Sequence, residues 1–275
     1  MPKGSSRKPR QMSKKMTKQV ETIVEKALAE ELEEKRAISQ YQAKSIESVI
    51  ASGNVLTNQT NYFDLLAPIT QVANSRSLSG APGGAYGFRI GDEINLKKVI
   101  IKGYCYLPDL TAANQGNTQI GVRVMILKQK DKDSYGGFRA DSHANKLLLD
   151  TVGVSGYQGP GQFNGAPLYL VREINRNEYA VRYDKVIHLS RDYIGGSSTS
   201  TKFAASSSKA LKFFEHELTF GKGKKLNFTD GASIVPNNFP YLLVVGQVNM
   251  ADPAVAVPAG TAKLTMSSTA VYTDA

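Results

Sequence analysis

β-Branched and aromatic residues are most concentrated in the stretch Arg89–Leu107. Valine, isoleucine and tyrosine crowd the segment Val99–Tyr106, no proline interrupts it before Pro108, and Gly91 stands near its start. A run of this kind, bounded by a turn residue and a proline, is typical of a long β-strand. We therefore expect residues 89–107 to form the strand around which the rest of the sheet is organised.

After this stretch, apolar runs alternate with long segments rich in glycine, serine and asparagine. Alternation of apolar and polar residues is clearest in Tyr179–Leu189 and Lys263–Tyr272. Strands joined by long loops, without crossover helices, favour an antiparallel sandwich. The predicted fold class is an all-β, eight-stranded antiparallel jelly-roll sandwich. Its seven other predicted strands are Gln119–Lys130, Lys146–Asp150, Glu178–Ser190, Ala210–Phe220, Lys224–Phe228, Phe239–Val248 and Ala262–Tyr272.

The pattern before the sheet domain has the period of a helix. Apolar residues over 17–51 recur three and four positions apart among good helix formers, with a phase shift near Glu34, and Gly53 supplies a stop. We expect one long or two shorter amphipathic helices within residues 17–53, packed on the chain's own domain or on symmetry-related copies. Residues 54–88 are expected to be a connecting segment, and residues 89–275 the jelly-roll domain.

Positive charge is concentrated at the N-terminus. The formal net charge is +10, and residues 1–18 supply seven of the ten excess charges without any acidic residue, so three remain for the other 257 residues. Residues 1–16 have too little apolar content to order themselves and are expected to be a flexible arm. Such an arm points to a polyanion, because phosphate contacts release counterions whatever the base sequence. The predicted nucleic-acid-binding residues are Lys3, Arg7, Lys8, Arg10, Lys14, Lys15 and Lys18.

Cysteine content and hydropathy indicate the kind of cellular compartment in which the protein is made. Cys105 is the one cysteine and lies inside the predicted strand, where we expect it to be a buried apolar residue and not a reactive thiol. No apolar run reaches the roughly 18 to 20 residues of a membrane span, and no signal peptide is recognisable at the N-terminus. The sequence predicts a protein that is made in a reducing compartment and has no membrane partner.

Residues that could carry catalysis are sparse. The three histidines, His143, His188 and His216, are not spaced as metal ligands, so no metal or other cofactor is expected. No nucleophile motif is found, and the chain is predicted not to be an enzyme. Gly221–Lys225 lacks the spacing of a phosphate-binding loop and favours a basic hairpin turn. The aromatic residues are scattered, with no evident stacking platform for bases.

Several stretches resemble one family of viral proteins. The strongest is Arg89–Gly103, which resembles the first long strand of capsid proteins from circovirus-like, small circular single-stranded DNA viruses that encode a replication initiator. Tyr179–Leu189, Asn238–Leu243 and the closing strand that ends at Asp274 are similar to that family too. The resemblance implies a jelly roll that assembles with itself into a small icosahedral shell of about 60 copies around a circular single-stranded genome. It places the protein in the virion and, during assembly, inside the host cell, with the nucleus as one candidate site.

Alternatives to this interpretation stay open. The arm is shorter and less arginine-rich than in many circovirus-type capsids, and satellite RNA viruses share the fold, so charge alone does not separate DNA from RNA. A jelly-roll carbohydrate-binding module would be a monomer or small oligomer with aromatic residues on a concave sheet face. A jelly-roll enzyme would need metal ligands. The host receptor of a capsid protein is not identified by the sequence.

Overall fold

The structure is a computed structural model of the chain. It describes residues 16–20, 22–23, 34–52, 55–56, 61–66, 68–69, 71, 88–108, 118–134, 144–149, 161, 163–194, 202–204, 209–252 and 257–275. Statements about structure below refer to these residues.

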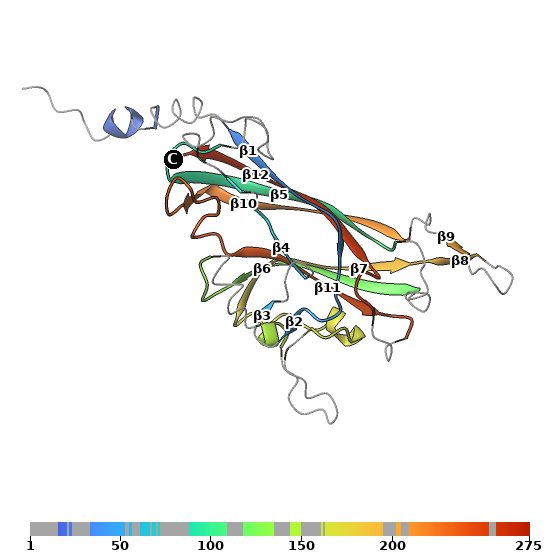
Figure 1. Ribbon diagram of the computed structural model, residues 1–275. Coiled ribbons are helices and arrows are strands. Elements are labelled where there is room, and N and C mark those ends of the chain that lie inside the picture. The colour runs from blue at the N-terminus through green and yellow to red at the C-terminus, as the bar shows by residue number, and fades with distance from the viewer. Residues whose placement is uncertain are drawn as a thin grey trace, which may run out of the picture.

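The described residues form two four-stranded antiparallel sheets that face each other (Figure 1). We call the sheet with the order β1-β12-β5-β10 the open sheet, and the sheet with the order β4-β11-β6-β7 the covered sheet. The open sheet contains β1 (Lys35–Ser45), β12 (Lys263–Asp274), β5 (Glu93–Tyr106) and β10 (Leu211–Asn227). The covered sheet contains β4 (Tyr62–Asp64), β11 (Tyr241–Asn249), β6 (Gln119–Gln129) and β7 (Tyr179–Ser190). The predicted all-β antiparallel sandwich is thus confirmed.

The core lies between the two sheets. In the open sheet, alternate residues of β5 point inward, among them Leu96, Val99 and Ile101, which are fully buried. Where β7 and β10 approach each other, Tyr183 lies 4.8 Å from His216 between ring centroids. One polar group crosses the core: Ser268 on β12 donates a hydrogen bond to the Leu65 carbonyl beside β4, at 2.5 Å. The sandwich is therefore held by a continuous apolar core with a satisfied polar contact.

A second layer of chain lies on the outer face of the covered sheet. It includes the 3-10 helices η2 (Ala144–Lys146) and η3 (Pro167–Leu170), and η3 packs on β6 and β11. Phe163, next to this layer, is almost fully buried and occupies the space that a Cβ atom at Gly246 would fill. Gly121 leaves similar space for Leu170. The strands beneath this cover are therefore buried on both faces.

The helix predicted for residues 17–51 is wrong in its second half. Residues 16–20 and 22–23 are helical, but Lys35–Ser45 is the edge strand β1, paired with β12. Ala37 and Tyr41 point toward the core, and Tyr41 packs edge-on against Phe63 at 5.2 Å. The spacing from Ile38 to Tyr41 also fits a helix, but pairing along the whole edge of β12 prevails over local propensity.

The sheets therefore begin at Lys35 and not at Arg89. Besides β1, the predicted connecting segment 54–88 contributes β4, which completes the covered sheet. A small ladder of β2 (Ala51–Ser52) with β3 (Val55–Leu56) precedes it. These strands are too short to give a periodic signal, and β4 depends on the neighbouring β11 for its place.

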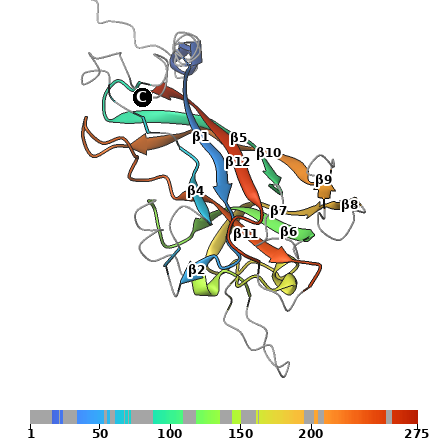
Figure 2. The same cartoon turned by 45° about the vertical axis from the view of Figure 1, so that its right-hand side comes forward.

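Two other predictions need correction. The described part of the expected strand Lys146–Asp150, residues 146–149, is not a strand: it holds the end of η2 and an isolated bridge from Leu148 to Ile174. The two strands expected at Ala210–Phe220 and Lys224–Phe228 are one strand, β10, with an irregularity between Thr219 and Lys224. The structure also contains a short ladder of β8 (Asp192–Ile194) with β9 (Lys202–Ala204), which projects from one end of the sandwich (Figure 2).

Candidate nucleic-acid interface

Most of the predicted nucleic-acid-binding residues lie outside the described residues. These are Lys3, Arg7, Lys8, Arg10, Lys14 and Lys15. Lys18 is described: it is exposed and lies in the helical residues 16–20, where its carbonyl accepts a hydrogen bond from the Thr22 hydroxyl at 2.8 Å. The structure thus places one of the seven cations, on a helical turn with its side chain open to solvent.

The first strand, β1, begins at one end of the open sheet. The helical residues 16–20 lie at that end, near the C-terminus, in both ribbon views (Figures 1 and 2). There β1 begins at Lys35, whose ammonium group forms an ion pair with Asp274 at the end of β12. The other oxygen of Asp274 accepts a hydrogen bond from the Ile90 amide at 2.9 Å. One carboxylate therefore links the first strand, the last strand and the entry to β5.

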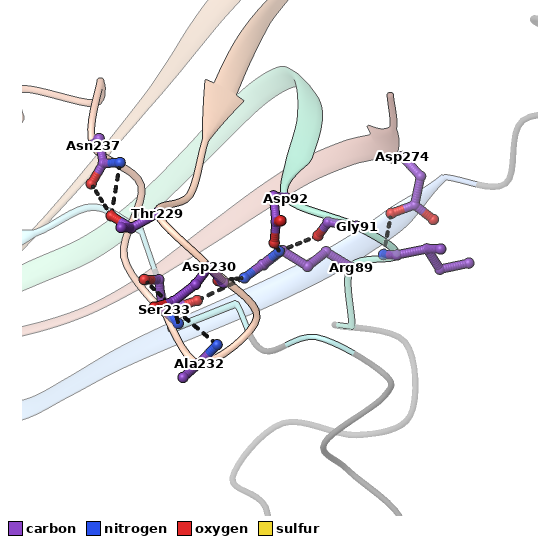
Figure 3. A network of polar contacts seen from close by, with 10 residues as sticks. Arg89, Gly91, Asp92, Thr229, Asp230, Ala232, Ser233, Asn237 and Asp274 are labelled. Atoms are coloured by element: carbon purple, nitrogen blue, oxygen red, sulfur yellow. Dashed lines mark hydrogen bonds and ion pairs between the residues drawn. The ribbon is translucent and has the colours of Figure 1, made fainter.

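Arg89 fixes the same end of the sheet from inside (Figure 3). Its side chain is completely buried, and its guanidinium donates hydrogen bonds to the Asp92 carboxylate at 3.0 Å and to the Gly91 carbonyl. The other terminal nitrogen donates to the carbonyls of Asp230 at 2.6 Å and Ser233 at 3.0 Å. A planar guanidinium can hold several carbonyl groups at once, so Arg89 joins the turn before β5 to the turn after β10.

The turn that Arg89 holds is ordered by its own side chains. The Asp230 carboxylate accepts hydrogen bonds from the Ser233 amide at 2.8 Å, the Ser233 hydroxyl at 2.9 Å and the Ala232 amide at 3.0 Å. Hydrogen bonds from the side chain and backbone of Ser233 lower the pKa of Asp230 below its usual value. The Arg89 guanidinium also stacks over the Phe228 ring, 4.2 Å from its centroid. This end of the open sheet is therefore fixed by a network of polar contacts around Arg89 and Asp230.

The outer face of the open sheet carries both signs of charge. Three cross-strand ion pairs join β5 to β10, each between partly exposed side chains. They are Lys98 with Glu217 at 3.5 Å, Lys102 with Glu215 at 2.9 Å, and Lys225 with Glu93 at 2.6 Å. These three lysines thus already have carboxylate partners, and seven of the ten excess positive charges of the chain lie in residues 1–18.

An aromatic cluster lies at the opposite end of this face. Tyr104 and Tyr106 are two residues apart on β5 and share one side of the strand. Tyr104 pairs with Phe213 of β10, and their ring centroids are 5.5 Å apart. The Tyr104 and Tyr106 rings are 5.8 Å apart, and Phe213 is 71% exposed. Three aromatic side chains thus lie together on one face of the open sheet, although the sequence shows its aromatic residues as scattered.

Sequence reasoning missed this cluster because it depends on register. The spacing of Tyr104 and Tyr106 is visible in the sequence and could have indicated a shared strand face. The place of Phe213, more than a hundred residues later, follows only from the pairing of β10 with β5. Burial raises the pKa of Tyr106, and neighbouring Tyr104 raises it further, so the Tyr106 ring stays neutral at physiological pH.

The basic segment Gly221–Lys225 is part of β10 and is not a hairpin turn. Gly221 and Gly223 have φ values of 58° and 109°, a backbone region that favours glycine. At Gly223 a Cβ atom would lie 1.9 Å from the amide oxygen of Asn95 on β5. The two glycines thus allow an irregularity that lets one strand continue where the sequence suggests a break.

The structure describes Cys105 and two of the three histidines, His188 and His216. Cys105 is buried as expected, and burial raises the pKa of its thiol to about 12. His216 lies in β10 and packs on Tyr183, and the His188 ring contacts the sulfur of Met250 at 3.1 Å. His143 lies outside the described residues. Among the described residues, no group of three or more histidine, cysteine or acidic side chains could hold a metal ion.

Comparisons with known protein families and with curated proteins find no match to this chain. None of its described helices is long and apolar enough to cross a membrane.

Proposed function

We propose that this chain is a structural capsid protein that assembles with itself into a small icosahedral shell and packages a single-stranded genome. The proposal depends mainly on the order of the eight strands in the two sheets, combined with a basic N-terminal sequence that precedes the first of them. The shell would contain about 60 copies. Lys3, Arg7, Lys8, Arg10, Lys14, Lys15 and Lys18 would contact phosphates without reading bases.

The strand order supports a jelly roll. Counted along the chain, the eight strands of the two sheets pair first with last, second with seventh, third with sixth and fourth with fifth, as β1–β12, β4–β11, β5–β10 and β6–β7. One long antiparallel hairpin that is rolled into two sheets has nested pairs of this kind. The ladder β5–β12 joins the two pairs of the open sheet, and the ladder β6–β11 joins the two pairs of the covered sheet. Such nested pairing is expected of the jelly rolls of viral capsid and lectin domains and supports that assignment.

The position of the arm supports the genome-binding role. The arm precedes β1, an edge strand, and the contacts of Lys35 and Arg89 give that end of the sheet a fixed structure. A cationic segment attached to a rigid base can neutralise phosphates in many arrangements, as non-specific packaging requires. The resemblance of Arg89–Gly103 to capsid proteins favours a circular DNA genome, and RNA is the alternative. The virion is the proposed location, with assembly in the host cell.

The test is expression of the full chain, followed by electron microscopy and measurement of the absorbance ratio at 260 and 280 nm. We expect uniform particles that protect nucleic acid from nuclease. A small species free of nucleic acid over a range of salt and pH would overturn the proposal.

Neutralising the arm separates its role from that of the sandwich. A variant with all seven arm residues changed to glutamine should still assemble but should package less nucleic acid. The matched control changes exposed cations of the sandwich, Arg176, Lys185, Lys209 and Lys222, to glutamine. Per charge removed, the control should lose less packaged nucleic acid. Equal losses would contradict the assignment of the arm.

A carbohydrate-binding module is a second candidate, because Tyr104 and Phe213 place exposed rings on a sheet face. Sugar rings pack on such faces in many binding domains. This candidate predicts a monomer that binds glycans on an array, and it assigns no role to the basic arm. Glycan binding by an unassembled product would favour it.

A further inference from the structure

We propose that Tyr104, Tyr106 and Phe213 form a site on which unpaired bases of single-stranded nucleic acid stack, with nearby lysines contacting the phosphates. The inference rests on the proposed packaging function and adds to it a contact on the folded body of the protein. We call these three residues the aromatic patch. The partner is defined by its chemistry: planar bases that are not paired, on a backbone of phosphates.

The geometry of the aromatic patch leaves ring surface accessible. Tyr104 and Phe213 meet edge to face, with 60° between their planes, and Tyr104 and Tyr106 are tilted by 47°. The rings therefore do not stack on one another. Phe213 is 71% exposed, and Leu211, which pairs with Tyr106, is 36% exposed. Aromatic faces exposed on a sheet are the surfaces on which single-stranded nucleic acids stack, without preference for a particular base.

Cations flank the rings. Lys263 of β12 pairs directly with Tyr106, so its side chain starts on the same face beside the aromatic patch. Lys102 precedes Tyr104 by two residues on that face and forms its ion pair with Glu215. A base on the rings would bring its phosphates over these two lysines. Rings bordered by cations fit a nucleotide, which carries an apolar base and an anionic backbone.

The surroundings of the aromatic patch favour nucleic acid over a second copy of the chain. Thr265 lies opposite Tyr104 on β12, and the Lys102–Glu215 pair borders the rings in the direction of the arm. The apolar strip is thus narrow and edged by charged and polar groups, whereas the centre of a protein interface is depleted in charge. The same outer face leads to the arm, because β1 belongs to this sheet.

A strand of nucleic acid could reach both sites. The arm is attached at the end of the open sheet where β5 begins, and the aromatic patch lies where β5 ends. The 14 residues of β5 span about 45 Å at the usual rise of a strand. A genome segment held by the arm can therefore run along the open face to the aromatic patch.

The experiment measures binding of the full chain, before assembly, to two probes at moderate salt. One probe is a short oligothymidylate, and the other is an abasic oligonucleotide with the same number of phosphates. The test variant changes Tyr104, Tyr106 and Phe213 to leucine, which keeps the face apolar but removes the rings. We expect about ten-fold weaker binding of oligothymidylate for each ring that a base engages. Binding of the abasic probe should not change, and the salt dependence should keep its slope.

Two further variants sharpen the test. Tyr104→Phe with Tyr106→Phe keeps the rings and should bind oligothymidylate as the natural chain does. Ile38→Ala changes an exposed apolar residue on the same face, away from the aromatic patch, and should also have no effect. Thermal unfolding of all variants checks that they fold, which is expected because the changed side chains lie on the outer face.

The outcomes separate this inference from the proposed function. If the natural chain binds the two probes equally and the leucine variant changes neither, the stacking site is overturned, while arm-dependent packaging still supports a capsid protein. If Phe213→Asp abolishes assembly and leaves probe binding intact, a second copy covers the face and the stacking site is again overturned. If the natural chain neither assembles nor binds either probe, both proposals fail.

Discussion

Strand β11, inside the covered sheet, is buried at all nine of its residues, whereas β5, inside the open sheet, alternates between buried and partly exposed residues. The two strands have comparable positions, each between two neighbours in a four-stranded antiparallel sheet. What differs is the layer outside them. Phe163 and the helix η3 lie over β11 and β6. The outer face of the open sheet around β5 instead has lysines, threonines of β12 and the aromatic patch.

This difference assigns the two faces of the sandwich to different tasks. The outer face of the covered sheet packs against other parts of its own chain. Its strands are therefore largely apolar, as is usual for strands buried on both faces. The open sheet keeps an alternating pattern because one face stays in contact with solvent or with a partner. The first strand after the basic N-terminal sequence belongs to the open sheet, and the proposed contacts with nucleic acid lie on its outer face.

Arg123 holds the cover on the covered sheet. Its guanidinium pairs with Asp184 at 2.6 and 2.8 Å and donates to the carbonyls of Tyr169 and Arg172, both at 2.7 Å. Its side chain is 4% exposed. Arg123→Leu would leave these acceptors without their donor, so we expect a loss of about 3–5 kcal/mol in the free energy of unfolding, measured by urea denaturation.

The matched control for Arg123 is the double variant Arg123→Leu with Asp184→Leu. It removes the charge that the single variant leaves unpaired and should recover part of the lost stability. If the single variant were as stable as the natural chain, the cover would not depend on Arg123.

Gly246 tests how tightly the cover packs. A Cβ atom there would lie 2.5 Å from a ring carbon of Phe163, so Gly246→Ala must displace that ring. Overpacking of this kind costs about 1–3 kcal/mol, and a lower melting temperature should report it. Ser267→Ala, on the outer face of the open sheet, is the control and should change stability by less than about 0.5 kcal/mol. Equal effects at the two positions would mean that the faces do not differ in packing.

His216 predicts a pH dependence at the place where the two sheets meet. Burial lowers the pKa of His216 below 6.5, its value in the unfolded chain. As the pH falls below 6.5, the unfolded state therefore binds the proton first, and the free energy of unfolding decreases until the folded-state pKa is passed. His216→Phe should flatten this part of the stability profile, measured by urea denaturation at a series of pH values. A profile that His216→Phe leaves unaltered would contradict the prediction.

The sequence predicted the strands that have a clear period or a long apolar run. The strands β5, β6, β7, β11 and β12 lie close to their expected positions, because their patterns reflect the face or faces that they bury. The strand β1 was mistaken for helix, since glutamate, lysine and alanine near Lys35 are good helix formers and its pairing partner is more than two hundred residues away. Local patterns contain no information about such a partner.

The candidate site was predictable only in part. The arm residues are evident from their charge, and Lys18 is exposed as a phosphate contact requires. The aromatic patch needed the register of β10 on β5, which the two glycines at Gly221 and Gly223 obscured by suggesting a turn. The buried role of Arg89 was also hidden, because a lysine or arginine at the start of a strand is usually exposed.

The Lys102–Glu215 pair should contribute little to stability, and breaking it should strengthen nucleic-acid binding. Both side chains are more than half exposed, at 63% and 61%, so Glu215→Gln should cost no more than about 0.5 kcal/mol in the free energy of unfolding, and less in high salt. The change frees Lys102 to contact phosphate beside the aromatic patch. Binding of oligothymidylate should therefore become tighter at low salt, and the slope of log affinity against log salt should steepen by about 0.7 for one added contact.

Glu217→Gln provides the matched comparison for Glu215→Gln, because Glu217 pairs with Lys98 nearer to the middle of β5. If nucleic acid follows the open face from the arm to the aromatic patch, both changes should steepen the salt dependence. If only Glu215→Gln does so, the contact is confined to the rings and their flanking lysines. If neither change alters the slope, the lysines of this face do not contact phosphate, and the open sheet differs from the covered sheet only in lacking a cover.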